Sequence, residues 1–88
     1  MKATITKIDP VRVGRDNRKY RLTCFKLDTG VNAISFICEG MKNYAKWDKL
    51  LEVGNILDGM KMYNDRTIDA DKSDPVLFFK PEKQTELF

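Results

Sequence analysis

The sequence contains no histidine, only two cysteines and no long run of apolar residues. Without histidine the chain lacks the commonest general base, and it has no glycine-rich phosphate loop or nucleophile motif. Cys24 and Cys38 do not have the spacing of a zinc site, and there is no histidine to complete one. We therefore expect a protein that is not an enzyme and that binds no metal or cofactor.

No apolar segment approaches the roughly 18 residues that a membrane-spanning helix needs. The N-terminal residues up to Ile5 also lack the apolar stretch of a secretion signal. Charged residues make up 33% of the chain, which favours a soluble protein. We expect a cytoplasmic protein that does not bind membranes.

The net charge of +3 is unevenly distributed along the chain. Residues 1–26 carry eight basic side chains and two acidic ones, whereas the remainder is slightly acidic. A concentrated positive region can attract a polyanion even when the total charge is modest. The alternative is a solvated basic surface that has no ligand.

Apolar and β-branched residues alternate in several segments, which predicts a mainly β protein with five principal strands. The first segment changes its apolar phase between Ile5 and Ile8 and contains Pro10, so we expect it to bulge or bend. Gly59 predicts a similar irregularity in the fourth strand. The strands are expected at residues 3–13, 19–27, 31–38, 56–63 and 75–79, with a short extended piece at residues 67–68.

One amphipathic helix is expected over residues 40–51. Met41, Tyr44 and Leu51 recur there at helical spacing, and Gly54 is a natural terminator. The same spacing predicts that Trp47 packs in the core.

The segment Asp28-Thr29-Gly30 predicts a tight turn between the second and third strands. If residue 27 pairs with residue 31, Cys24 faces residue 34 and Cys38 faces residue 20. The two sulfurs would then be roughly 13 Å apart along the strands, which is too far for a disulfide. We expect both cysteines to be reduced core residues.

The order β-β-β-α-β-β, with the helix between the third and fourth strands, resembles the OB-fold, a five-stranded barrel. An SH3-like small barrel is the main alternative, but it does not need a helix at that point. The resemblance covers roughly residues 3–79. We expect residues 1–79 to form the OB-fold domain and residues 80–88 to form a flexible tail.

In OB-folds the ligand face is formed by strands two and three and the flanking loops. Basic side chains on such a face would bind phosphates, and aromatic rings would stack on the bases of a single strand. Tyr20 and Phe25 alternate along one strand, so the sequence leaves open which of them faces the ligand. Phe36 of the third strand is a further candidate on this face. The residues expected to contact nucleic acid are Arg15, Arg18, Lys19, Tyr20, Arg21, Phe25, Lys61, Tyr63 and Arg66.

The last five residues, Gln84-Thr85-Glu86-Leu87-Phe88, resemble the bacterial sliding-clamp-binding pentapeptide. Gln84, Leu87 and Phe88 match its anchor positions, whereas Thr85 and Glu86 depart from its pattern. The resemblance implies that the tail inserts Leu87 and Phe88 into an apolar pocket of a sliding clamp or DNA polymerase.

In size, strand order and lysine-rich composition the chain is also similar to small OB-fold accessory proteins of polymerases or primases on bacterial mobile elements, including the middle protein of staphylococcal cassettes. We therefore expect a single-stranded DNA-binding accessory protein of a DNA-replication assembly. One alternative is a protein-interaction subunit that docks on a polymerase or sliding clamp and has little affinity for nucleic acid. Another is an RNA-binding domain of the translation machinery, since OB-folds serve many ligands. The sequence does not separate DNA from RNA.

Overall fold

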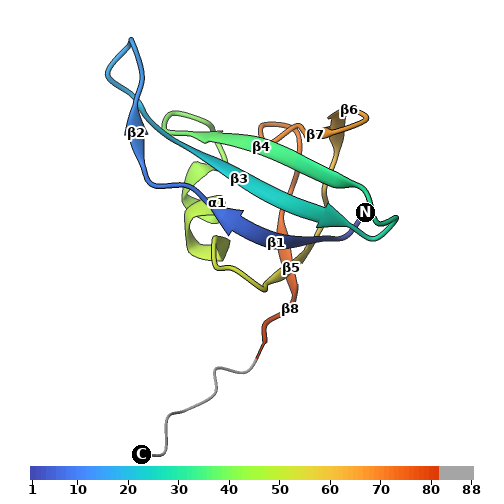
Figure 1. Ribbon diagram of the computed structural model, residues 1–88. Helices are drawn as coiled ribbons and strands as arrows, with labels where there is room; N and C mark the ends of the chain where they lie inside the picture. Colours follow the sequence, from blue (N-terminus) through green and yellow to red (C-terminus); the bar gives the residue numbers. More distant parts are fainter. Residues whose placement is uncertain (82–88) are drawn as a thin grey trace, which may run out of the picture.

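A computed structural model describes residues 1–81 as a strongly curled, mainly β sheet with a single helix (Figure 1). The strands follow the order β6-β7-β4-β3-β1-β5-β8 across the sheet, and β2 pairs with β3. The elements are β1 (Ala3–Ile8), β2 (Arg12–Val13), β3 (Lys19–Leu27), β4 (Asn32–Cys38), α1 (Tyr44–Leu50), β5 (Ile56–Asp58), β6 (Met62–Asn64), β7 (Thr67–Ile68) and β8 (Val76–Phe79).

The expected number of five strands is wrong, because two of the expected strands are interrupted and the short piece at residues 67–68 forms a strand of its own. The first strand divides around Pro10 into β1 and β2, and both parts pair with β3. Its register also shifts between Ile5 and Lys7, which confirms the predicted bulge. The bend allows one segment to follow β3 along a curved path.

Gly59 interrupts the fourth expected strand and separates β5 from β6. Its φ angle is +82°, and a Cβ atom here would lie 2.1 Å from the carbonyl oxygen of Asp74. The two backbones come this close because the Asp74 N–H donates a hydrogen bond to the Gly59 carbonyl at 3.0 Å. Only glycine fits both the backbone angle and the close contact.

The hairpin between β3 and β4 has the predicted register. The Leu27 N–H donates to the Val31 carbonyl at 2.8 Å, Cys24 lies opposite Ile34, and Cys38 lies opposite Tyr20. Both cysteines are free. They are half-buried and lie on the face of the hairpin that points away from the core, so the expectation that they are core residues is wrong.

The helix is shorter than expected and lies between β4 and β5. Gly40 adopts a φ of +95°, which is incompatible with a right-handed helix, so the chain turns before α1 begins at Tyr44. The Asn43 side-chain amide then donates to the carbonyls of Ala70 and Ser73 at 2.9 and 2.7 Å. These bonds attach the start of α1 to the segment before β8.

Trp47 of α1 is fully buried against the inner face of the sheet, as predicted. Its ring meets Phe25 edge-to-face, with centroids 6.1 Å apart, and its Nε1–H donates to the Ala70 carbonyl at 2.9 Å. This packing determines which side of β3 and β4 faces inward. The other buried apolar residues are Ala3, Ile5, Leu27, Ala33, Ile37, Leu57, Met60, Ile68 and Ala70.

The first two residues of the expected tail contact the domain. The Lys80 ammonium lies 3.4 Å from a carboxylate oxygen of Glu52, and Pro81 is half-buried. Within residues 1–81, no helix has the length and apolar character needed to cross a bilayer.

Candidate nucleic-acid interface

Side chains alternate between the two faces of β3, and the structure settles which aromatic residue faces outward. Phe25 is only 1% exposed and packs on Trp47, so the expectation that Phe25 contacts nucleic acid is wrong. Tyr20 alternates with Arg21, and it lies on the opposite side of the strand from Phe25. We call the side that carries Tyr20, Leu22 and Cys24 of β3, together with Ile34 and Phe36 of β4, the outer face.

The aromatic pair of the outer face is Tyr20 and Phe36. Leu22 lies directly opposite Phe36 in the β3–β4 ladder, which makes Tyr20 the diagonal neighbour of Phe36. The two ring centroids are 6.2 Å apart and the ring planes are tilted by 47°. Phe36 is 52% exposed, so a large part of its ring is open to solvent.

A first hollow lies beside this pair and has Arg12 in its wall. Arg12 of β2 lies opposite Tyr20 of β3, and both line the hollow with Leu22, Phe36 and Asp9. Arg12 was not among the expected contact residues. The sequence already predicted a bend in the first segment. If the part after the bend is paired with the second expected strand, Arg12 comes opposite Tyr20.

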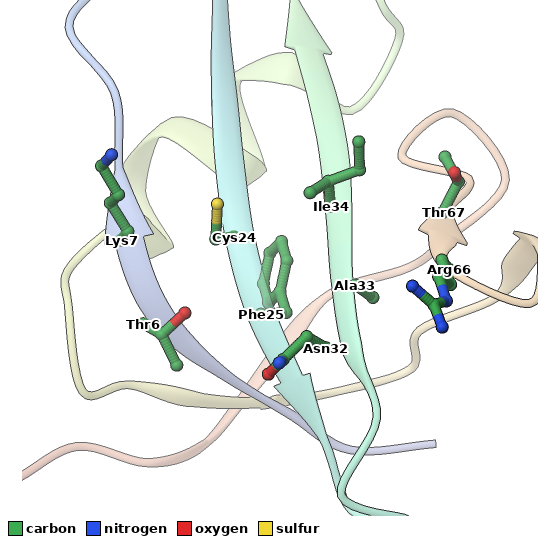
Figure 2. A pocket seen from close by; sticks show the side chains of 9 residues that line it. All are labelled: Thr6, Lys7, Cys24, Phe25, Asn32, Ala33, Ile34, Arg66 and Thr67. Atoms are coloured by element: carbon green, nitrogen blue, oxygen red, sulfur yellow. The ribbon is translucent and has the colours of Figure 1, made fainter.

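A second hollow, of about 530 Å³, lies farther along the same face (Figure 2). Lys7 of β1 and Arg66, just before β7, stand on opposite sides of it, with Cys24 and Ile34 between them. Arg66 was expected at the interface, whereas Lys7 was not. The bulge in β1 changes which of its side chains point outward. The sequence indicated the bulge, but its effect on the direction of the Lys7 side chain was not worked out.

The third hollow shares one wall residue with each of the other two. Phe36 also lines the first hollow, and Thr67 also lines the second. Tyr63 of β6 forms another part of its wall and is 73% exposed, which makes it the most exposed large apolar or aromatic side chain of the described residues. Asp69 and Asp71 also line this hollow and add negative charge.

Lys61 does not line any of these three hollows. It lines a fourth hollow together with Lys42 and Lys72, and Asp71 is common to the third and fourth hollows. Asp74 in the same wall is hydrogen-bonded to the Lys46 ammonium, which lowers the pKa of Asp74 below 3.8, and the positive charge of Lys61 lowers it further. Asp74 is therefore ionised at neutral pH and offsets part of the lysine charge.

The basic residues expected in and after the first loop do not share one surface. Arg15, Arg18 and Lys19 are exposed at the β2–β3 hairpin, which projects beyond the body of the sheet (Figure 1). An Arg18 nitrogen lies 3.3 Å from a carboxylate oxygen of Asp16. Arg21 alternates with Tyr20, is half-buried and has its Nε without a hydrogen-bond partner, so it lies away from the outer face.

The tail residues Gln84, Leu87 and Phe88 lie outside the described residues. In the part of the chain that is described, no three cysteine, aspartate or glutamate side chains gather into a possible metal site. The outer face and the hollows beside it therefore combine three partly exposed rings, Tyr20, Phe36 and Tyr63, with the cations of Lys7, Arg12 and Arg66. No protein-family model, curated protein or solved structure matches this chain.

Proposed function

We propose that this chain binds single-stranded DNA through its outer face, as a non-catalytic accessory protein of a DNA-replication assembly. The observation that carries the proposal is the partly exposed Tyr20–Phe36 pair, which shares a hollow with Arg12. Aromatic rings stack on exposed bases for about 1–3 kcal/mol per base, and a cation beside them neutralises the adjoining phosphate.

The wall residues that neighbouring hollows share support a path for an extended strand. Phe36 and Thr67 each belong to two hollows, so a strand that stacks on Tyr20 can continue past Phe36 toward Tyr63 or toward Arg66. Lys7 and Arg66 would contact phosphates on the second of these routes. Lys61 would contact phosphates only if the strand continued past Asp71.

We further propose that the sheet is a variant of the OB barrel. In this interpretation β1 with β2, β3, β4, β5 with β6, and β8 are the five principal strands, and α1 lies between the third and the fourth. The parallel pairing of Ile34 with Thr67 supports it, because β7 continues the curled sheet beyond β4.

The direct test is fluorescence anisotropy with a labelled oligo-dT strand at increasing salt concentration. We expect binding at low salt that weakens as the salt concentration rises, because cations on the protein displace counterions from the phosphates. Duplex DNA of the same length should bind more weakly, since its bases are not free to stack. A matched RNA strand determines whether the site distinguishes the two sugars. The absence of binding to every single strand at low salt would refute the proposal.

A second candidate function is that of a subunit that docks on a polymerase or sliding clamp and has little affinity for nucleic acid. The resemblance of Gln84-Thr85-Glu86-Leu87-Phe88 to a clamp-binding peptide favours it. Deletion of residues 84–88 separates the two candidates. If the outer face is the ligand site, DNA affinity survives the deletion; if the tail is the functional element, the truncated chain no longer retains a purified clamp or polymerase.

A further inference from the structure

The strand β8 exposes four consecutive apolar side chains. Val76, Leu77, Phe78 and Phe79 are 51%, 43%, 58% and 52% exposed. Neighbouring side chains of a strand point to opposite sides, so these residues expose apolar surface on both sides of β8. They lie several strands away from the Tyr20–Phe36 pair in the sheet, and none of them lines the four hollows described above. The Lys2 ammonium lies 4.4 Å from the centroid of the Phe78 ring. Hydrophobic patches of this kind on a soluble protein mark interaction sites.

The backbone of β8 is also available for pairing. One side of β8 pairs with β5, and β8 is the last strand of the sheet, so its other side has no partner strand among residues 1–81. An exposed apolar edge strand is a template for another strand, which would add backbone hydrogen bonds to the burial of side chains.

The charges that flank β8 identify a suitable partner. Asp74 lies before the strand and Lys80 lies after it, and both are exposed. When two copies of one strand pair antiparallel about a two-fold axis at Leu77, each Asp74 comes opposite the Lys80 of the other copy. Within the same arrangement Val76 comes opposite Phe78, and Leu77 meets its own copy. A single strand thus supplies both halves of a complementary contact.

We propose that β8 pairs with β8 of a second copy of this chain to form a symmetric dimer centred on Leu77. A two-fold axis at Phe78 is the neighbouring alternative, and it places Val76 opposite Lys80 without a charge pair. The axis at Leu77 also keeps the centre of the contact away from Phe78, where β8 has an extra residue relative to β5.

The contact is short, so the dimer is weak. Four residues per copy bury less than a standard protein–protein interface, and we expect a dissociation constant of about 10–100 µM. Asp74 and Lys80 are already paired with Lys46 and Glu52, respectively. These exposed pairs can be shared with or exchanged for the contacts between copies, because surface ion pairs contribute little free energy.

Sedimentation equilibrium of the full chain over roughly 1–500 µM tests the dimer, since this range spans the expected dissociation constant. Leu77→Lys places two ammonium groups face to face at the axis, and we expect it to raise the dissociation constant at least about tenfold. Val13→Lys is the matched control: Val13 is also an exposed apolar strand residue, but it lies in β2, and its substitution should leave the dimer unchanged. A wild-type chain that stays monomeric throughout this range overturns the proposal.

A charge exchange tests the register. Asp74→Lys and Lys80→Asp should each weaken the dimer because like charges then meet across the axis. The double variant with both exchanges restores opposite charges and should recover most of the affinity. If the loss of dimerisation free energy in the double variant equals the sum of the losses in the two single variants, the register centred on Leu77 is wrong.

Disulfide trapping tests the same register without relying on charge. With Cys24 and Cys38 replaced by serine, Leu77→Cys should form a covalent dimer on mild oxidation, because facing Cα atoms of antiparallel strands are within disulfide range. Val76→Cys should crosslink far less, since it faces Phe78. Deletion of residues 82–88 completes the design: a dimer that is lost on this deletion but survives Leu77→Lys is held by the tail, which also overturns the proposal.

Discussion

The two faces of β3 consist of neighbouring residues of one strand but have different roles. The inner side carries Phe25, which is buried against Trp47, whereas the outer side carries Tyr20, whose ring lies beside the half-exposed ring of Phe36. Both sides contain aromatic rings, so composition does not distinguish them. The difference lies in the neighbours: helix α1 covers the inner ring, and the charged residues Arg12 and Asp9 surround the outer pair. An aromatic residue is a candidate ligand contact only when its surroundings leave it open.

The largest expected effect is on the inner side. Phe25→Ala removes a fully buried ring and leaves a cavity beside Trp47, so we expect the free energy of unfolding to fall by about 3–5 kcal/mol. Chemical denaturation monitored by circular dichroism measures this change. Tyr20→Ala, on the other side of the same strand, should lower the free energy of unfolding much less. If both substitutions lower it equally, the assignment of the two faces is wrong.

On the outer side the expected effect is on binding. Phe36→Ala should weaken oligo-dT binding by about 1–3 kcal/mol, because a stacking surface is lost, while the free energy of unfolding changes little. Anisotropy titration at a fixed low salt concentration measures the affinity. Val31→Ala, an exposed apolar residue of the β3–β4 turn, is the control that should bind like the wild type. If Phe36→Ala also binds like the wild type, the outer face is not the stacking site.

A smaller effect, on the salt dependence of binding, shows whether the phosphates contact the wall of the first hollow or the projecting hairpin. Arg12→Ala should reduce the slope of log affinity against log salt concentration by about 1, as expected for the loss of one phosphate contact. Arg15→Ala tests the hairpin in the same assay. An unchanged slope for Arg12→Ala together with a reduced slope for Arg15→Ala would move the phosphate path from the outer face to the hairpin.

The smallest expected effect concerns the neighbouring residues Leu57 and Asp58 of β5. Leu57 is fully buried, whereas the Asp58 carboxylate accepts a hydrogen bond from the Gly59 N–H at 2.8 Å. This bond lowers the pKa of Asp58 below 3.8, and the nearby N-terminal amine lowers it further. The ionised form is thus favoured by folding, and its stabilising effect is present at neutral pH and lost as the pH falls below 3.8. Asp58→Asn should flatten the acid limb of a thermal-stability profile slightly, and an unchanged acid limb would contradict this role.

The sequence predicted the local features of the fold better than the relations between its parts. The β3–β4 register followed from the turn at Asp28-Thr29-Gly30, and the burial of Trp47 followed from helical spacing. The number of strands could not be derived from the sequence. Whether Pro10 and Gly59 bend a strand or interrupt it depends on the backbone segments that pack against them in the fold. The contact between Gly59 and Asp74, for example, joins segments far apart in the chain.

The candidate site was also predictable in its local features but not in the relations between its parts. Strand alternation showed that Tyr20 and Phe25 face opposite sides, but only the position of α1 decides which side is closed. Lys7 and Arg12 were missed because the bulge and bend of the first segment determine where they lie. Arg21 was overvalued because basic residues near one another in sequence were assumed to share a surface.

Trp47 has a practical consequence for solution experiments. It is the only tryptophan of the chain, it is completely shielded from solvent, and its indole N–H is bonded to Ala70. Its intrinsic emission should therefore respond to loss of the native packing and remain nearly constant when a ligand covers the opposite side of the sheet. One optical signal can thus monitor the integrity of every variant, while an external label on the oligonucleotide records its association.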